Sequence, residues 1–253
     1  QALQHSGDVF RDALGLYPQA RQCYELALKR APLAPDTLAS LAEMAFGAED
    51  NVNALKFLNL ATSSPERLND PSRVAELFWA RGQCLEALNR SQEAAESYRH
   101  VLTHRADHLQ ALEDLARLLI NSEAWDAAKP VVEDLARRTH APGIRASHTL
   151  ALAKVCAELK KTDKSIRLYQ EALEHLPRRF GAHLELAELL RKKDPKSAKR
   201  HFEFVLGGDD STPVVHRAEA RIALGSLCEV EFKDPTAAAG HLQAATSLPG
   251  KHR

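Results

Sequence analysis

Apolar residues recur at helical spacing seven times along the chain, with polar residues between them. Each copy begins with a small residue, has a larger residue four positions later, and ends three positions after that. The triplets are Ala20/Tyr24/Ala27, Ala54/Leu58/Ala61, Ala94/Tyr98/Val101, Ala128/Val132/Leu135, Ser165/Tyr169/Ala172, Ala198/Phe202/Val205 and Ala237/His241/Ala244. Positions i, i+4 and i+7 share one face of an α-helix, so each triplet predicts an amphipathic helix. The first residues of successive triplets are 34, 40, 34, 37, 33 and 39 positions apart, a period that indicates stacked helical repeats.

A second pattern precedes each triplet from the second onward by 11 or 12 residues. Its copies are Leu41-Ala42, Arg81-Gly82, Leu115-Ala116, Leu152-Ala153, Leu186-Ala187 and Leu224-Gly225. We call the upstream helix of each pair helix A and the helix with the triplet helix B, and we expect the first helix A at about residues 2–14. No segment alternates apolar and polar residues at period two, so the fold class predicted is all-α.

Helix-start and helix-end residues fall where this scheme needs them. Asp194-Pro195 and Asp234-Pro235 precede two helices B, where Asp caps the first turn and Pro needs no hydrogen-bond partner. Comparable starts are Asp50, Ser91, Ser122 and Asp163. The prolines expected after the ends of helices B are Pro32, Pro65, Pro177 and Pro249.

This lattice resembles the tetratricopeptide repeat family over essentially the whole chain. The copies that carry the resemblance best are Ala20/Tyr24/Ala27/Pro32, Ser165/Tyr169/Ala172/Pro177, and Gly225 followed by Ala237/His241/Ala244/Pro249. The resemblance implies a right-handed superhelical solenoid of antiparallel helix pairs, with helix A lining the concave face. We expect one solenoid over 1–253, with repeats at approximately 1–34, 35–69, 70–107, 108–144, 145–178, 179–212 and 213–250.

The ends and the cysteines bear on the setting of the chain. It begins at Gln1 and has no obvious capping helix, so we expect a fragment of a longer protein. No apolar run is long enough for a transmembrane segment. Cys84, Cys156 and Cys228 share one phase of alternate repeats, too far apart to form disulfides with each other. Free thiols weakly favour a reducing compartment, the cytoplasm or nucleus.

The sequence carries no signature of catalysis. It has no Gly-rich phosphate loop, no nucleophile elbow, no paired-His zinc helix and no Cys-x-x-Cys. His100, His104 and His108 are four residues apart, but we expect them on two different helices. We therefore predict no catalytic residue, no metal site and no cofactor, and a protein that is not an enzyme.

The predicted binding surface follows from the phase of helix A. In this scheme three positions of helix A are not used for packing between helices. They lie three residues before the small site, one residue after it and four residues after it. They give the candidate groove residues Glu43, Phe46, Trp79, Gln83, Glu86, Glu113, Arg117, Ile120, Leu150, Lys154, Glu188 and Arg191. The same phase also selects Ala39, Ala157, Leu184, Ile222, Ser226 and Glu229. Trp79 is either packed between helices or a partly exposed anchor for a partner.

The leading hypothesis is a non-catalytic scaffold that holds a segment of another protein or peptide in this groove. Residues 137–201 hold 16 Lys and Arg against 7 Asp and Glu, a net charge of +9. This basic block leaves nucleic-acid or anionic-surface binding open as an alternative, although many of its charges belong at helix ends. A helper or assembly domain of a larger enzyme or complex, and self-association through uncapped ends, also remain open.

Overall fold

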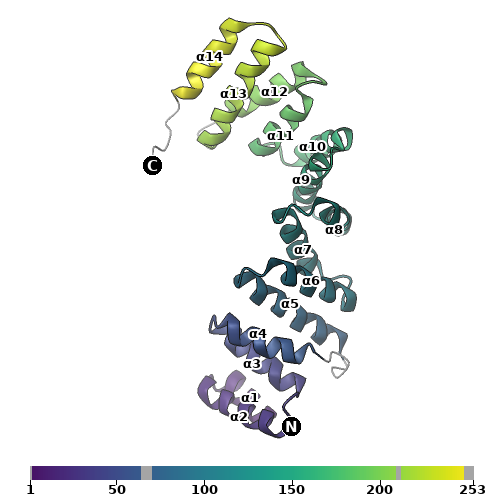
Figure 1. The fold of residues 1–253 in the computed structure, drawn as a ribbon, viewed down its shortest axis with the longest axis vertical. Helices are drawn as coiled ribbons and strands as arrows, with labels where there is room; N and C mark the ends of the chain where they lie inside the picture. The colour runs from purple at the N-terminus through teal and green to yellow at the C-terminus, as the bar shows by residue number, and fades with distance from the viewer. Residues whose placement is uncertain (1, 64–69, 209–211, 248–253) are drawn as a thin grey trace. The chain divides into compact units, whose positions relative to one another are not determined.

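The computed structural model describes residues 2–63, 70–208 and 212–247, and within them the regular structure is entirely helical (Figure 1). The prediction of an all-α helical-repeat solenoid is confirmed. Contacts divide the chain into two compact units, Gln1–Ser122 and Glu123–Arg253. The boundary falls inside the predicted repeat at 108–144, so the single solenoid over 1–253 stays a prediction.

The helices follow the predicted A–B alternation in both units. In the first unit they are α1 (Ala2–Asp8) with the π-helix η1 (Val9–Ala13), α2 (Tyr17–Arg30), α3 (Pro35–Gly47), α4 (Asn51–Ala61), α5 (Pro71–Ala87), α6 (Ser91–His104) and α7 (Leu109–Asn121). In the second unit they are α8 (Trp125–Arg138), α9 (Pro142–Glu158), α10 (Thr162–His175), α11 (Phe180–Leu190), α12 (Pro195–Leu206), α13 (Val214–Val230) and α14 (Pro235–Thr246). Within each unit every helix packs against the next, and the helices A α11 and α13 also touch.

The triplets of helix B form the core. Those of the second to sixth repeats are buried at all three positions, and Ala20 and Tyr24 are fully buried in the first. The seventh differs, because His241 is only half-buried. A methyl group added at Gly225 would lie 2.8 Å from Cγ of Leu242, which is 42% exposed, so Leu242 rather than His241 lies against this small site of helix A.

Two buried tyrosines of helix B each pack their ring against a glycine of helix A. A Cβ at Gly82 would lie 2.5 Å from Tyr98 Cε1, and one at Gly7 would lie 2.4 Å from Tyr24 Cε1. Gly7 precedes Ala20 by 13 residues rather than 11 or 12. The π-helix η1 lies between the two and holds an extra residue in its turn, which explains why the sequence pattern missed the first small site.

Aspartates cap four helices through their side chains. Asp50, Asp70, Asp194 and Asp234 each accept a backbone N–H in the first turn of α4, α5, α12 and α14. The expected starts at Ser91 and Asp163 lie one and two positions inside their helices, and Ser122 ends α7 instead. Pro32 and Pro177 follow α2 and α10 as predicted. Pro65, Pro249 and the predicted repeat ends at 69 and 250 lie outside the described residues.

The turn from helix A to helix B contains a left-handed residue in five repeats. These residues are Glu49, Asn89, Glu123, Lys160 and Lys233, with φ between 52° and 59°. Each stands immediately before the residue that caps helix B. A residue with a Cβ is strained in this conformation, so the turn geometry is imposed by the packing of the helix pair.

All four cysteines are described and carry free thiols. Cys84, Cys156 and Cys228 are buried, and Cys23 is half-buried. Burial raises the pKa of Cys84 to about 11 and also raises the pKa of Cys156. These thiols therefore act as small apolar residues of the core.

Candidate binding groove

Two adjoining cavities open on the helix A side of the second unit. The cationic cavity, about 630 Å³, is lined by Ser147, Leu150, Ala151, Lys154, Tyr169, Arg178, Arg179, Phe180, Gly181, Ala182, Glu185, Pro213 and His216. The acidic cavity, about 530 Å³, is lined by Lys154, Ala157, Glu158, Tyr169, Leu184, Glu185, Glu188, Leu189, Phe202, Glu219 and Ile222. They share Lys154, Tyr169 and Glu185, and we call the two together the groove. Helices α9, α11 and α13 supply most of it.

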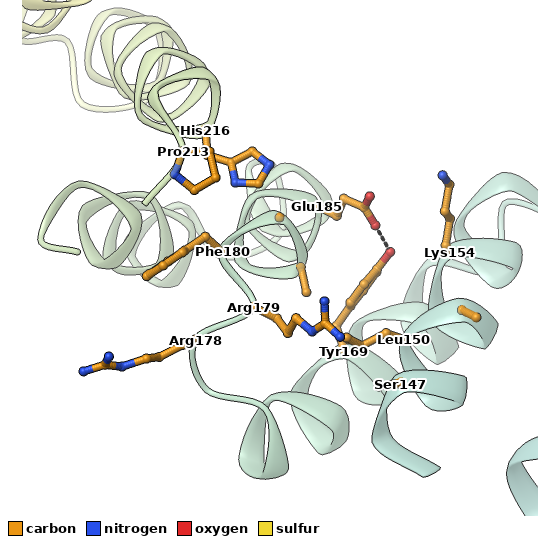
Figure 2. Close-up of a pocket in the computed structure, with 13 residues that line it drawn as sticks. Ser147, Leu150, Lys154, Tyr169, Arg178, Arg179, Phe180, Glu185, Pro213 and His216 are labelled. Atoms are coloured by element: carbon orange, nitrogen blue, oxygen red, sulfur yellow. Dashed lines mark hydrogen bonds between the residues drawn. The ribbon is translucent and has the colours of Figure 1, made fainter. Parts of the chain in front are cut away.

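The cationic cavity is built around the turn between α10 and α11. Arg179 is the N-cap residue of α11, and its side chain extends toward Leu150 and Tyr169, whereas Arg178 points away to the other side of the turn (Figure 2). Lys154 approaches from α9 and His216 from α13 (Figure 2). Lys154, Arg179 and His216 therefore reach the cavity from three separate helices.

Tyr169 and Glu185 form the wall between the two cavities. The Tyr169 hydroxyl donates a hydrogen bond to Glu185 Oε2 (Figure 2). Burial and this bond raise the pKa of Tyr169. The same arrangement recurs in the first unit, where Tyr24 donates to Asp8 Oδ1 at 2.8 Å and Tyr98 donates to Glu86 Oε1 at 2.6 Å. The helix B tyrosines thus fix a carboxylate on the helix A side.

The acidic cavity has an apolar floor and a carboxylate rim. Leu184 and Phe202 are buried beneath it, whereas Ile222 is 54% exposed. Glu158 and Glu219 are exposed on its rim, beside Glu188. Such a combination suits an aliphatic side chain with a positive charge next to it.

Three of the predicted groove residues in the second unit lie where the phase of helix A places them. Leu150 and Lys154 line the cationic cavity, and Glu188 lines the acidic one. Arg191 instead donates to Ser226 Oγ at 2.8 Å and to Glu188 Oε2 at 3.2 Å. It therefore holds α11 against α13 rather than lining the groove.

In the first unit the predicted residues Glu43, Glu86 and Arg117 form ion pairs between successive helices A. Arg11 and Arg73 both contact Glu43, at 3.0 and 2.8 Å. Arg117 donates two hydrogen bonds to Glu86, at 2.7 and 2.8 Å. We call these contacts the ion-pair ladder. Sequence reasoning assigned Glu43, Glu86 and Arg117 to a partner, but in the structure they connect neighbouring repeats.

The other predicted residues of this unit are more scattered. Trp79 is half-buried and its Nε1–H donates to Asp114 Oδ2 at 3.1 Å, so it is packed and bonded. Gln83, Glu113 and Ile120 are half-buried, and Phe46 is 39% exposed. Ala39, selected by the same phase, is fully buried. A cavity of about 1160 Å³ at η1, α2, α3 and α4 includes Glu43 but not Phe46, Gln83, Glu113 or Ile120.

Much of the basic block is engaged within the protein. Arg138 binds Asp134 at 2.8 Å, Lys164 binds Glu133 at 2.6 Å, and Lys193 binds Asp163. The block is also spread over helix ends and turns, from Arg137 at the end of α8 to Arg200 in α12. These pairs reduce the positive charge that a nucleic acid would find there.

The histidines at 100, 104 and 108 do not converge. His100 and His104 both stack on Phe78, with ring centroids 4.7 and 6.0 Å apart. His108 caps α7 by accepting the Ala111 N–H at 3.1 Å. Within the described residues no cluster of three or more His, Cys, Asp or Glu side chains could hold a metal. In that same part of the chain no helix is long and apolar enough to cross a bilayer.

The fold and the groove define an all-α helical-repeat protein. Residues 11–67 and residues 75–108 each match a model described as tetratricopeptide repeat. The chain thus contains tetratricopeptide repeats in residues 11–67 and 75–108. Repeats of this kind are generally non-catalytic scaffolds for protein interactions.

Solved structures of the same fold agree. The C-terminal part of a TPR repeat-containing protein from Cytophaga hutchinsonii is 16% identical, with a TM-score of 0.63 over 96% of this chain and 95% of that one. PilF of Pseudomonas aeruginosa is 22% identical, with a TM-score of 0.55 over 86% and 93%. YrrB, described as a TPR protein with an unusual peptide-binding site, is 12% identical, with a TM-score of 0.58 over 72% and 90%. No curated protein matches the chain in sequence.

Proposed function

We propose that this chain is a scaffold that binds an extended segment of a partner protein in the groove of its second unit. One observation carries the proposal: the two adjoining cavities include Leu150, Lys154 and Glu188, which the repeat pattern selects as unused by packing. Together they offer an elongated surface with apolar and charged positions in fixed order. Because the fold already holds these side chains in place, binding a segment costs little free energy for ordering the scaffold.

The solved relative YrrB, described as having a peptide-binding site, is consistent with this role. The charged residues predicted in the first unit do not belong to the proposed site. Glu43, Glu86 and Arg117 are occupied by the ion-pair ladder, so a partner would have to displace existing pairs to reach them. The groove in the second unit requires no such displacement at Lys154.

Peptide selection tests the proposal. A random peptide library displayed inside a carrier loop is selected on the full chain, and the enriched peptides are measured by fluorescence anisotropy. Ile222→Asp replaces an exposed apolar side chain in the acidic cavity and should weaken binding about tenfold, because burying a charge without a partner is unfavourable.

Val230→Asp is the matched control, because Val230 is 62% exposed on the same helix and lines neither cavity. It should leave affinity unchanged, and circular dichroism should show both variants folded. Equal affinities for the two variants, or a selection that yields no binder, would contradict the proposed function.

A further inference from the structure

The groove reverses its charge along its length. Lys154 and Arg179 on the cationic side make no ion pair within the described residues, unlike Lys164 of the same unit. Glu158 and Glu219 on the acidic side also make none among those residues. Four charged side chains of this groove are therefore available to a bound segment, two of each sign. Arg179 lines only the cationic cavity, Glu158 and Glu219 line only the acidic cavity, and Lys154 lies where the two meet.

Two helix N-termini reinforce the positive end. The first turn of α11, residues 180–182, lines the cationic cavity, and so do Pro213 and His216 at the start of α13. Each helix N-terminus is equivalent to about half a positive elementary charge. His216 Nδ1 is shielded from solvent there and has no hydrogen-bond partner among the described residues. The cavity is therefore suited to negative charge from several directions.

The negative end is combined with an apolar contact surface. Ile222 is 54% exposed beside the buried Leu184 and Phe202, and Glu158 and Glu219 flank this surface. An aliphatic side chain can cover Ile222 while a neighbouring cation reaches the carboxylates. The order along the groove is thus cationic site, apolar site, acidic site.

We propose that the bound segment carries two acidic side chains, then an aliphatic residue, then a basic residue, in the order that matches these three sites. This inference rests on the proposed function. Apart from Arg178, which points away from the other groups (Figure 2), Lys154, Arg179 and two helix N-termini, less the carboxylate of Glu185, leave roughly two positive charges. Two Asp or Glu side chains match that charge, whereas a single C-terminal carboxylate supplies only one.

The test uses the selected peptides and charge-reversed variants of the full chain. Arg179→Glu should weaken binding about fivefold or more, and replacing the acidic residues of the peptide by Lys should restore it. Glu219→Lys should have a comparable effect, restored when the basic residue of the peptide becomes Glu.

Matched controls are Arg167→Glu and Glu171→Lys on α10, which make the same charge changes at exposed positions outside both cavities. They should shift affinity by less than about twofold, since exposed charges at a distance are screened by salt. Equal losses in the groove and control variants would overturn the assignment of the two ends.

The possible outcomes distinguish a failure of this inference from a failure of the proposed function. If no peptide depends on Ile222, the proposed function fails. If peptides depend on Ile222 but show no acidic and basic ends, the function stands and the charge pattern is overturned. A second library, displayed with a free C-terminus, tests whether the cationic cavity binds a C-terminal carboxylate instead of acidic side chains. Binders found only in that library would assign the cationic cavity to a C-terminal carboxylate and overturn the acidic pair.

Discussion

Gly82 shows how closely helix A and helix B approach at a single residue. A Cβ added at Gly82 would lie only 2.5 Å from Tyr98 Cε1, so the Tyr98 ring already fills that space. Gly82→Ala should therefore lower the free energy of unfolding by about 1–3 kcal/mol, because the buried ring must move. Urea denaturation measures the change.

Gly47→Ala is the matched control in the same unit, since a Cβ at Gly47 meets no atom within 4 Å. It should be neutral or slightly stabilising, because Ala favours helix over Gly. A loss of stability equal to that of Gly82→Ala would show that the tyrosine contact is not the cause.

At Lys160 we expect a change to glycine to stabilise the protein. Its φ is 58°, a conformation that costs a residue with a Cβ about 1–2 kcal/mol. Glycine relieves this strain but loses about 0.4–1 kcal/mol through the entropy of the unfolded chain. We expect Lys160→Gly to raise the free energy of unfolding by about 0.5–1 kcal/mol, measured in urea. Lys161→Gly, at φ −88°, should bring no gain.

At the scale of elements, the ion-pair ladder joins helices A of neighbouring repeats. Arg117→Glu would place a negative charge beside Glu86 and Asp114, which Arg117 contacts at 2.7 and 3.1 Å. Because these groups are partly in water, we expect a loss of only about 1 kcal/mol at low salt. The loss should shrink in 0.5 M NaCl. Arg99→Glu on α6, with no ion pair within the described residues, should be close to neutral in thermal denaturation at both salt concentrations.

A pair of histidines, His183 buried and His201 half-buried, makes the stability of α11 and α12 depend on pH. His183 Nε2–H donates to the Pro177 carbonyl oxygen at 3.0 Å, which leaves its Nδ1 to accept from His201 Nδ1–H at 2.9 Å. Burial lowers the pKa of both rings, and for His201 the neighbouring His183 and Arg200 lower it further. As the pH falls, these two rings are therefore protonated at a lower pH in the folded state than in the unfolded state, where the pKa of histidine is about 6.5.

Stability should accordingly be highest above pH 6.5 and fall as the pH drops toward the lowered pKa values. The urea midpoint is compared at pH 7.5 and pH 5.5. His201→Gln should show a smaller drop in the urea midpoint between pH 7.5 and pH 5.5, because one of the two rings with a lowered pKa is gone. An unchanged drop in this variant would assign the pH dependence to other groups.

The elements themselves could largely be predicted from the sequence. The triplets identify helix B because apolar periodicity reflects burial directly. The first small site, Gly7, was missed because the π-helix adds a residue, and Gly225 lies against Leu242 rather than His241. Local hydrogen bonding and turn length decide such shifts, and neither leaves a clear periodic signal.

At the scale of the whole molecule, the groove lies entirely within one compact unit. We therefore expect residues 123–253 expressed alone to be helical and to bind the selected peptides within about threefold of the full chain. Circular dichroism and anisotropy measure the two properties. A helical fragment with lost binding would place essential residues in 1–122.

The candidate site was only partly predictable. Phase identified Leu150, Lys154 and Glu188 because exposure follows helical periodicity. It could not separate them from Glu43, Glu86 and Arg117, which have the same phase but pair with neighbouring repeats. The contribution of Arg179, in a turn, and of His216, at a helix start, depends on tertiary packing and was not predicted.

The alternating signs of the ion-pair ladder constrain how the number of repeats can change. Arg11 and Arg73 are both positive and stand on either side of Glu43. Recombination that deleted residues 35–69 would set the two arginines against each other. Duplication of the same segment would oppose two copies of Glu43. Either event would replace attraction with repulsion at a repeat junction, so the ladder favours retention of the order and number of repeats in this unit.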